Sequence, residues 1–503
     1  MVSSCGYSSS VECDLPKVDR WVRLPLPAPC PLRLRMQGLF LCAGQKQLAP
    51  GCRIGYDRGR KEERKRIPMN TAFNAPAYLG GCCAGALYNA GPMAADDEHT
   101  YTAEDSFMQL IFGTCTEEFE AYLKRCQAEG FRLTRRDHGL TAEGAQLVRD
   151  GDFLYVSFNP LTGKVRITRD PKTSDLSAFS CPLDCPDSAV IVQYGLYYDP
   201  DNTCTAMTAN CGMFYVVKLC DNSLFLIDGG HECQFSEAAT EELHTFLHEL
   251  TGIPEQEPIE IAGWYFSHAH SDHMAALPRL LWKYPGQYHV SRLLFNFPSW
   301  QIVSSGYDPE IKQLKEAIRE LCGDALFLKL HTGMKFQLGN VELEVLYTHE
   351  DAVREDEPAR YPFLDFNSTS TVLKMTTGGQ SVLWLGDANH ELQELFRETT
   401  RPEAWKADVV QVAHHCINCL PELYSWVGAD WALLPNRRSN APGRTLGEQW
   451  ALMADQMPDA DRIYYEEQTQ VFRFRDGQFE LLQTRPLVGW AYDGTDVYGK
   501  KRK

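Results

Sequence analysis

The 503-residue sequence has no long hydrophobic run and fewer basic than acidic residues. No stretch approaches the roughly 18 to 20 consecutive apolar residues that a bilayer-spanning helix needs, so we predict no membrane span. Lys and Arg number 49 against 67 Asp and Glu, and the net charge of -18 disfavours general nucleic-acid binding. Because 44% of the residues are apolar, fibrous and wholly disordered classes are excluded.

The signatures of several common enzyme classes are also missing. The sequence has no Gly-x-Ser-x-Gly elbow, no phosphate loop of the form Gly-x-x-x-x-Gly-Lys-Ser/Thr, and no Gly-x-Gly-x-x-Gly directly after a strand-like segment. No clear hydrophobic signal segment is found in the first thirty residues or at 70–95, so we expect a cytoplasmic location. The 18 cysteines lie mostly within apolar stretches, which favours reduced core thiols, such as Cys126 and Cys220, over a disulfide scaffold.

The first 68 residues differ from the rest of the chain. They hold 13 Lys or Arg against 6 Asp or Glu and show neither a helical nor a strand period. Two explanations remain open, a basic disordered tail or an untranslated leader. The second arises because residues 59–66 can be encoded almost entirely by purines, as a ribosome-binding site ahead of a start at Met69 would be. Residues 69–105 are expected to form a linker.

Residues 106–172 indicate a small α+β module. Apolar residues recur with helical spacing at 119–126, and Gly130 is expected to end that helix. Strand-like runs follow between residues 131 and 168. The polar residues of this module form no recognisable site, so we expect a structural role.

Long apolar strands alternate with amphipathic helices from residue 189 to residue 483. This alternation predicts a layered α/β domain. Near its end, strand-like runs at 463–465, 471–475 and 479–482 are expected to close one sheet. Residues 484–503 are expected to be a tail.

One short motif in this domain gathers several metal-binding side chains. The segment His268-Ala269-His270-Ser271-Asp272-His273 directly follows a strand-like run at 259–266 and precedes a helix. In an extended segment His268 and His270 point the same way, and the turn into the helix brings Asp272 and His273 to a neighbouring position. Imidazole nitrogen and carboxylate oxygen suit zinc, iron or manganese, and the absence of thiolate argues against a closed structural site. We therefore predict two adjacent ligand pairs.

The motif resembles the HxHxDH turn of the metallo-β-lactamase fold superfamily, and three other segments are similar to landmarks of that family. Asp228, in Leu-Ile-Asp-Gly-Gly, matches an aspartate that supports the metal-binding turn through hydrogen bonds. Asp387, at the end of Val-Leu-Trp-Leu-Gly-Asp, matches a carboxylate that bridges two metals. His414 and His415, after a strand-like run, match a late histidine ligand, and the paired form is similar to the hydrolase domain of DNA-uptake competence proteins, the ComEC-like branch.

The resemblance implies a fold, a cofactor and an activity. The fold is a four-layer αββα sandwich, and the cofactor is Zn²⁺ at two sites, with Mn²⁺ or Fe also compatible. The implied activity is that of a metal-dependent hydrolase that uses a metal-bound hydroxide, with Asp272 and Asp387 as catalytic carboxylates. The implied ligands are His268, His270, Asp272, His273, Asp387, His414 and His415. Of the last two, His414 ends the strand and is the better candidate.

The sequence departs from the family pattern at two places. Many members supply a further histidine between the motif and Asp387, whereas the corresponding segment here carries Asn367, as the competence-type branch does. His349 could fill this gap. After the histidine pair, where the branch has glycine, Cys416 and Cys419 stand either as small residues in a tight turn or as a redox pair. Occupancy of both metal sites is therefore an open question.

Substrate recognition is predicted from residues expected at the rim of the site. Asn367, Asn436, Arg437 and Arg438 are the candidates, because two adjacent Arg beside Asn can clamp phosphate or carboxylate. A solvated loop is the equal alternative. We predict a small phosphodiester or other anionic ester as substrate. The alternative function is a catalytically silent domain of this fold that senses a ligand or binds a protein, and the oligomeric state is left open.

Overall fold

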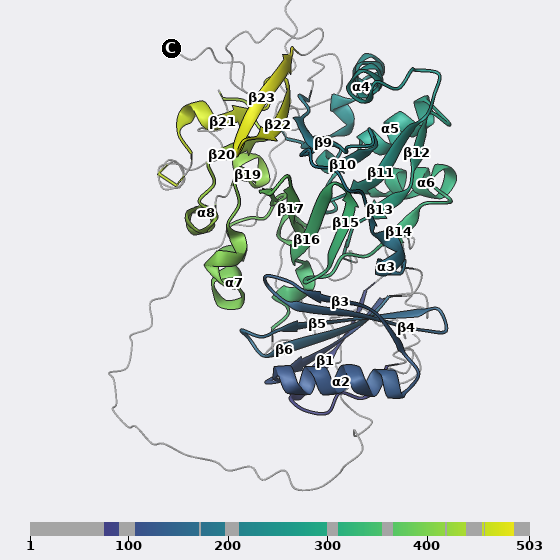
Figure 1. Ribbon diagram of the computed structural model, residues 1–503, viewed down its shortest axis with the longest axis vertical. Coiled ribbons are helices and arrows are strands. Elements are labelled where there is room, and N and C mark those ends of the chain that lie inside the picture. Colours follow the sequence, from purple (N-terminus) through teal and green to yellow (C-terminus); the bar gives the residue numbers. More distant parts are fainter. Residues whose placement is uncertain are drawn as a thin grey trace, which may run out of the picture. The chain divides into compact units, whose positions relative to one another are not determined.

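The computed structural model describes residues 75–89, 106–170, 173–196, 211–298, 310–354, 366–417, 420–438, 455–456 and 458–486. All of them belong to the unit Arg53–Lys503. The expected leader at 1–68 lies outside the described residues, as does most of the expected linker. The described strands form three sheets, which Figure 1 shows together with their helices.

The first of these, the module sheet, has six antiparallel strands in the order β1-β2-β6-β5-β4-β3. Its strands are β1 (Cys82–Asn89), β2 (Ser106–Phe112), β3 (Arg132–His138), β4 (Glu143–Arg149), β5 (Asp152–Asn159) and β6 (Lys164–Arg169). Helix α2 (Thr116–Ala128) covers one face of this sheet. Its buried residues are Phe119, Tyr122, Leu123 and Cys126, which confirms the helical spacing of the sequence.

Strand β1 lies in the segment that was expected to be a linker. It pairs antiparallel with β2 from Cys82 opposite Phe112 to Asn89 opposite Ser106, with one irregularity between Cys83 and Gly85. The linker prediction is wrong for these residues. Their backbone completes an edge of the module sheet, whereas their glycine and alanine content carries little strand signal.

Two further sheets form the larger part of the chain. The first sandwich sheet has the order β14-β13-β11-β10-β9-β8-β22-β23, with β12 paired to β11, and the second has the order β21-β20-β19-β18-β17-β16-β15-β7. The first contains β8 (Val190–Gln193), β9 (Phe214–Lys218), β10 (Leu224–Asp228), β11 (Ile259–Tyr265), β12 (Tyr288–Val290), β13 (Arg292–Leu294), β14 (Leu326–Leu328), β22 (Thr469–Arg475) and β23 (Gln478–Arg485). The second contains β7 (Cys181–Pro182), β15 (Lys335–Gly339), β16 (Val341–Tyr347), β17 (Val372–Thr377), β18 (Gln380–Trp384), β19 (Val409–Gln411), β20 (Trp431–Leu434) and β21 (Ile463–Tyr465).

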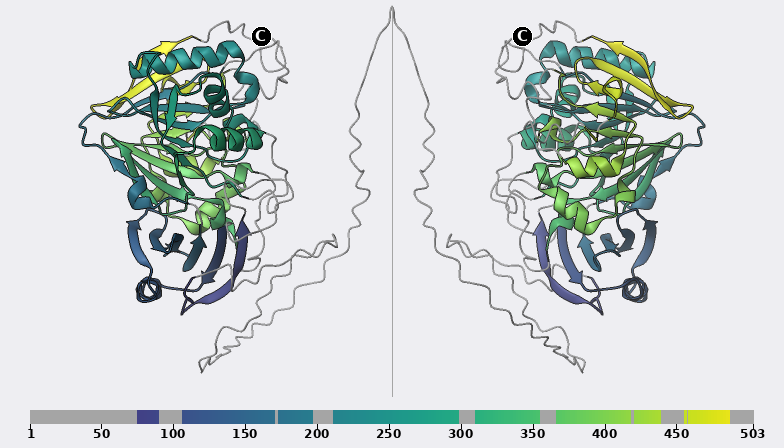
Figure 2. Two further views of the ribbon diagram at one scale, coloured as in Figure 1. Left: turned by 90° about the vertical axis from the view of Figure 1, so that its right-hand side faces the viewer. Right: turned by 90° about the vertical axis from the view of Figure 1, so that its left-hand side faces the viewer.

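Helices cover the outer face of each sandwich sheet (Figure 2). Helices α4 (Glu237–Thr251), α5 (Ala276–Lys283) and α6 (Glu310–Leu321) pack on the first, and α7 (Leu392–Thr399) and α8 (Pro421–Val427) on the second. The short helices are α3 (Leu176–Phe179), η2 (Glu232–Gln234), η3 (Ser271–His273), η4 (His349–Ala352), η5 (Asn367–Thr369), η6 (Pro402–Trp405), η7 (His414–Cys416) and η8 (Ala460–Arg462). In the described parts of the chain, no helix combines the length and apolar character of a membrane span.

One hydrophobic core lies between the two sandwich sheets. It joins residues of the first sheet, such as Tyr215 and Phe225, to residues of the second, such as Val345 and Trp384. The order of layers is therefore helix, sheet, sheet, helix. This confirms the predicted four-layer αββα sandwich, with the small α+β module packed at one end.

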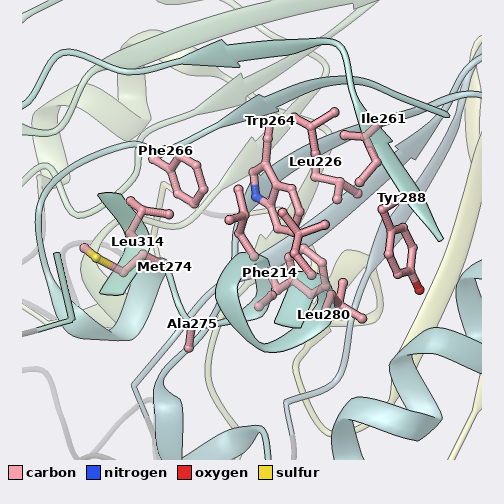
Figure 3. Packing of buried hydrophobic residues seen from close by; sticks show 14 of the residues in the cluster. Phe214, Leu226, Ile261, Trp264, Phe266, Met274, Ala275, Leu280, Tyr288 and Leu314 are labelled. Atoms are coloured by element: carbon pink, nitrogen blue, oxygen red, sulfur yellow. The ribbon is translucent and has the colours of Figure 1, made fainter. Parts of the chain in front are cut away.

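A second core, on the helix side of the first sandwich sheet, connects directly to the histidine motif. Figure 3 shows Trp264 of β11 packed between Phe214 and Phe266, with Met274 and Ala275 from the segment after the motif reaching the same cluster. The Trp264 indole also donates through Nε1 to the carbonyl oxygen of Asp228 at 2.8 Å. Truncation of a buried aromatic side chain of this size to alanine destabilises a fold by about 3–5 kcal/mol. The motif thus starts from a rigidly held strand end.

The last three strands do not close one sheet as expected. β21 pairs in parallel with β20 in the second sandwich sheet, whereas β22 and β23 form a hairpin at the end of the first. The chain crosses between the two sheets in the few residues from 466 to 468. Strand periodicity does not reveal such a crossing, because a strand in either sheet alternates its side chains in the same way.

Cysteines occupy three kinds of environment. Cys126 and Cys322 are buried thiols, as the apolar stretches predicted, but the Cys220 thiol is exposed. Cys233 in η2 is disulfide-bonded, so the expectation of reduced thiols is wrong for this residue. The sequence around Cys233 is no more polar than that around the thiols, so composition does not separate the two cases.

Candidate metal centre

Four strand ends meet at one edge of the sandwich. β10 ends at Asp228, the motif follows β11, Asp387 follows β18, and the histidine pair follows β19. Because β10 and β11 are parallel, and β18 and β19 are parallel, the carboxyl ends of each pair lie side by side. Gly386 lets the two sheets approach here, since its φ is +55° and a Cβ on it would lie 2.8 Å from the Cβ of Ser267.

Asp272, His273, Asp387 and His415 bring one donor atom each to a common point, all within 4.8 Å of one another. His273 Nε2 lies 3.2 Å from Asp387 Oδ2 and 3.6 Å from Asp272 Oδ1. His415 Nε2 lies 3.1 Å from Asp387 Oδ2 and 3.2 Å from Asp272 Oδ2. Among the described residues, neither imidazole nitrogen has a hydrogen-bond partner, although both are buried. Two imidazoles and two carboxylates at this spacing fit one ion bound at about 2.0–2.2 Å.

The charges around this point favour a cation. Burial alone would lower the pKa of His273 and His415, but Asp387 and Asp272 beside them raise both pKa values well above the ordinary range. Burial would likewise raise the pKa of Asp387, and His415 and His273 instead hold it well below its ordinary value. The pKa of Asp272 is lowered by the same neighbours against its burial. The two carboxylates therefore require positive charge between them, which a divalent ion would supply.

Asp228 lies behind the motif and contacts two of its residues. Its Oδ2 atom lies 2.9 Å from His273 Nδ1, and its Oδ1 atom accepts from the backbone N–H of Ser267 at 2.7 Å. The Ser267 hydroxyl donates to Asp228 Oδ2 at 2.9 Å and lies 3.0 Å from His268 Nδ1. These contacts hold the Nδ1 side of both imidazoles and turn Nε2 toward the front of the site.

A second group of donors lies next to the first. His268 Nε2 is 3.1 Å from His270 Nδ1, 3.1 Å from Asn367 Oδ1 and 3.8 Å from Asp387 Oδ2. The Asn367 amide also lies 3.1 Å from His414 Nε2. Burial lowers the pKa of His268 well below its ordinary value, so its ring is neutral and able to ligate. Asn367 thus stands where many members of the resembled family have a histidine.

The histidine pair corrects the preference for His414. The structure places His415 among the four converging donors and His414 against Asn367. The reason is a tight turn after β19, in which His414, His415 and Cys416 have φ values of +51°, +48° and +64°. Three consecutive non-glycine residues in the left-handed region store strain, which is common at functional sites. The turn directs the second imidazole of the pair, and not the first, to the site.

The other candidate ligand, His349, lies elsewhere. It begins η4, is fully buried, and its Nδ1 atom is 3.7 Å from Glu350 Oε2 in a cluster that also contains Lys329 and His331. The proposal that His349 fills the vacant ligand position is therefore wrong. His390, three residues after Asp387, is exposed.

Two of the residues expected to bind substrate, Asn436 and Arg438, have other contacts. Asn436 is buried and donates through Nδ2 to the carbonyl oxygen of His415 at 3.0 Å, so it supports the turn, and its role in substrate binding stays a prediction. Arg438 stacks on Tyr465, with its guanidinium carbon 4.8 Å from the ring centroid. Arg437 is half-buried at the end of β20, and its role in substrate binding stays a prediction. Cys416 is buried in the left-handed turn, whereas Cys419 lies outside the described residues.

One further residue of the site was missed. Glu466, directly after β21, is 7% exposed, and the charges that act on its carboxyl are those of His415, Arg437 and His273. Burial raises its pKa to about 8. The residue lies in a polar turn with no motif spacing, so the sequence offers no signal for it.

No family model matches the sequence, and no curated protein matches it. The structure is similar to the metallo-β-lactamase fold protein YhfI from Bacillus subtilis, with 14% identity and a TM-score of 0.32, over 56% of this chain and 97% of that one. It is also similar to CmlA, a diiron β-hydroxylase from Streptomyces venezuelae, with 16% identity and a TM-score of 0.28, over 56% and 45%. The Zn(2+)-bound PqqB from Methylobacterium extorquens has 11% identity and a TM-score of 0.27, over 44% and 71%.

Metallo-β-lactamase fold proteins are thus among the structural neighbours of this chain. At such low identities and TM-scores these likenesses say nothing of activity, and the fold is established by the sheet order and layers described above. The ComEC-like branch, expected from the histidine pair, has no support in these comparisons. The candidate site accordingly rests on its own geometry.

Proposed function

We propose that this protein is a metal-dependent hydrolase and that Asp272, His273, Asp387 and His415 hold its ion. The observation that carries the proposal is the convergence of these four donors at the meeting point of the two sandwich sheets. Zinc is the first candidate because the set combines imidazole nitrogen with carboxylate oxygen, and manganese and iron are the alternatives.

The two carboxylates of the site would have different roles in hydrolysis. A bound divalent ion would lower the pKa of a water molecule and polarise the ester that is attacked. The Asp272 side chain is 16% exposed against 2% for that of Asp387, so Asp272 is the donor open to substrate. Its carboxylate can orient the attacking water and accept the proton, while Asp387 holds both imidazoles. Both carboxylates are therefore assigned catalytic roles in this proposal.

A second ion is proposed at the neighbouring donors His268 Nε2, His270 Nδ1 and Asn367 Oδ1. The distances of 3.1 Å from His268 Nε2 to the other two atoms support it. An amide oxygen is a harder and poorer zinc ligand than imidazole, so we expect this position to bind less tightly. The ratio of metal to protein should then depend on free metal concentration.

The substrate we propose is a phosphodiester or another anionic ester. Support comes from Arg437, which is half-buried, follows the strand β20 that lies parallel to β19, and acts electrostatically on Glu466. Arg is well suited to hold a phosphate or carboxylate group. A cytoplasmic location and kinship with the ComEC-like branch belong to this proposal as predictions from the sequence.

One observation favours a second candidate function, a catalytically silent domain that senses a ligand or binds a protein. The Asn367 amide already contacts His268 and His414, on nitrogen atoms that a metal would otherwise use. If this contact persists in solution, the chain holds at most one ion. The two functions then differ in metal content and in turnover.

Metal analysis together with turnover of bis-p-nitrophenyl phosphate tests the proposal. Wild-type protein should retain about one ion per chain after gel filtration, and Asp387→Ala should lose both the ion and at least about 100-fold in turnover. Asp324→Ala removes an exposed carboxylate far from the site and serves as the matched control. Metal-free wild-type protein, or turnover that Asp387→Ala leaves intact, would contradict the hydrolase and favour the silent domain.

A further inference from the structure

The two imidazoles of the four-donor site differ in their outer contacts. His273 directs Nε2 to the site and has Nδ1 2.9 Å from Asp228 Oδ2. His415 also directs Nε2 to the site, but its buried Nδ1 has no hydrogen-bond partner in the part of the chain that the structure describes. Histidines that ligate metals almost always donate their other N–H to a carboxylate, a carbonyl oxygen or water. His415 therefore needs an acceptor on its Nδ1 side.

Glu466 is a buried carboxyl close to this ring. Its Oε2 atom is buried and also lacks a hydrogen-bond partner among the described residues. Of all charges that act on Glu466, that of His415 has the largest effect. Each of the two residues thus has a buried polar atom without a hydrogen-bond partner in the described part of the chain, and their side chains interact electrostatically.

Asn436 ties the two residues together. Its side-chain Nδ2 donates to the carbonyl oxygen of His415 at 3.0 Å, and its own carbonyl oxygen accepts from the backbone N–H of Glu466 at 3.0 Å. The turn that carries His415 and the turn that carries Glu466 are therefore both fixed to Asn436, the first by its side chain and the second by its backbone.

We propose that Glu466 is the outer carboxylate partner of His415 and orients this imidazole for the ion, as Asp228 does for His273. The proposal rests on the proposed metal site and adds a positioning residue to it. Glu466 Oε2 accepts from Nδ1–H, which fixes the tautomer that presents the Nε2 lone pair to the ion. Such outer partners change metal affinity by about 10- to 100-fold.

The test is metal affinity, measured on the full chain by competition with a chromophoric chelator for Zn²⁺. Glu466→Gln keeps the size of the side chain but replaces the carboxyl group with an amide, and we expect about 10- to 100-fold weaker binding. Glu466→Asp, which keeps the carboxylate, should recover part of this loss. Glu480→Gln makes the same change of charge on an exposed residue of the neighbouring hairpin and should bind as the wild type does.

A second readout separates positioning from a merely structural role. The visible absorption of the Co²⁺-loaded protein reports the geometry of the ligands, and Glu466→Gln should shift it while Glu480→Gln should not. If Glu466→Gln lowers the melting temperature but leaves both the affinity and the Co²⁺ spectrum unchanged, the inference is overturned. If the wild-type chain itself binds neither ion, the proposed metal site has failed, and that result is distinct.

Discussion

Arg166 in β6 and Asp351 in η4 form an ion pair across 185 residues of sequence, with Nη1 2.7 Å from Oδ1. Arg166 is almost fully buried, and Lys164 on the same strand donates through Nζ to the carbonyl oxygens of Asp351 and Val353 at 2.8 and 2.7 Å. The small module is thus fixed to the turn that follows β16. The polar residues of the module, in which the sequence shows no recognisable functional site, form this junction.

Loss of this ion pair should destabilise the chain. Arg166→Met removes the guanidinium and leaves the Asp351 carboxylate in a partly buried position, at a cost of about 3 kcal/mol in the free energy of unfolding. Arg397→Met breaks the exposed pair with Glu422 and should cost less than about 1 kcal/mol. Urea denaturation of the three proteins measures both values. Equal stability of the two variants would show that the junction contributes no more than a surface contact.

The two histidines after β19 should differ sharply in metal binding. His415→Ala removes one of the four converging donors and should weaken Zn²⁺ binding by at least about 100-fold. His414→Ala removes a contact to Asn367 and should retain the tightly bound ion. Chelator competition on both variants makes the comparison, because each is the other's control. If His414→Ala lost the ion and His415→Ala kept it, His414 would be the ligand, as its position at the end of the strand predicted.

The sequence was sufficient to predict those features of the site and of the fold that are marked by a local motif or by local apolar periodicity. The motif at 268–273, Asp228 and Asp387 all lie at strand ends that apolar runs reveal, and parallel strands carry such residues to one edge. The αββα layers follow from the alternation of strands and helices. These features depend on residues close to one another along the chain.

Features that depend on backbone direction or on distant pairing could not be predicted. The choice of His415 over His414 is made by three left-handed residues that no composition rule marks. Glu466 reaches the site because the chain crosses between sheets directly after β21. Strand β1 forms because it pairs with β2. The side-chain pattern of β1 gives no sign of this pairing.

Removal of the ion should lower the thermal stability of the wild-type protein. A ligand that binds only the folded chain stabilises it in proportion to the logarithm of its concentration over Kd, by about 4 kcal/mol at 1,000 times Kd. Excess EDTA should therefore lower the melting temperature of the wild type, and refilling with Zn²⁺ should restore it. His415→Ala should show no EDTA effect. A wild-type melting curve indifferent to EDTA would argue against a tightly bound ion.

His349, although not a ligand, should affect the pH dependence of stability. Burial lowers its pKa to about 4, which outweighs the opposite effect of Glu350 beside it. The unfolded chain binds a proton on this histidine near pH 6.5, whereas the folded chain does so only near pH 4. Between pH 4 and pH 6.5 the folded chain therefore binds fewer protons than the unfolded chain. The free energy of unfolding must then fall as the pH drops from 6.5 to 4.

His349→Gln should flatten this part of the stability profile. The full effect of such a shift is roughly 3 kcal/mol, spread over the window from pH 6.5 to pH 4. Urea denaturation at half-unit steps of pH, in the presence of EDTA so that metal loss does not contribute, should give a smaller slope for the variant than for the wild type. His390→Gln replaces an exposed histidine and should keep the wild-type slope. Parallel profiles for His349→Gln and the wild type would mean that His349 takes up its proton equally in the folded and unfolded chains.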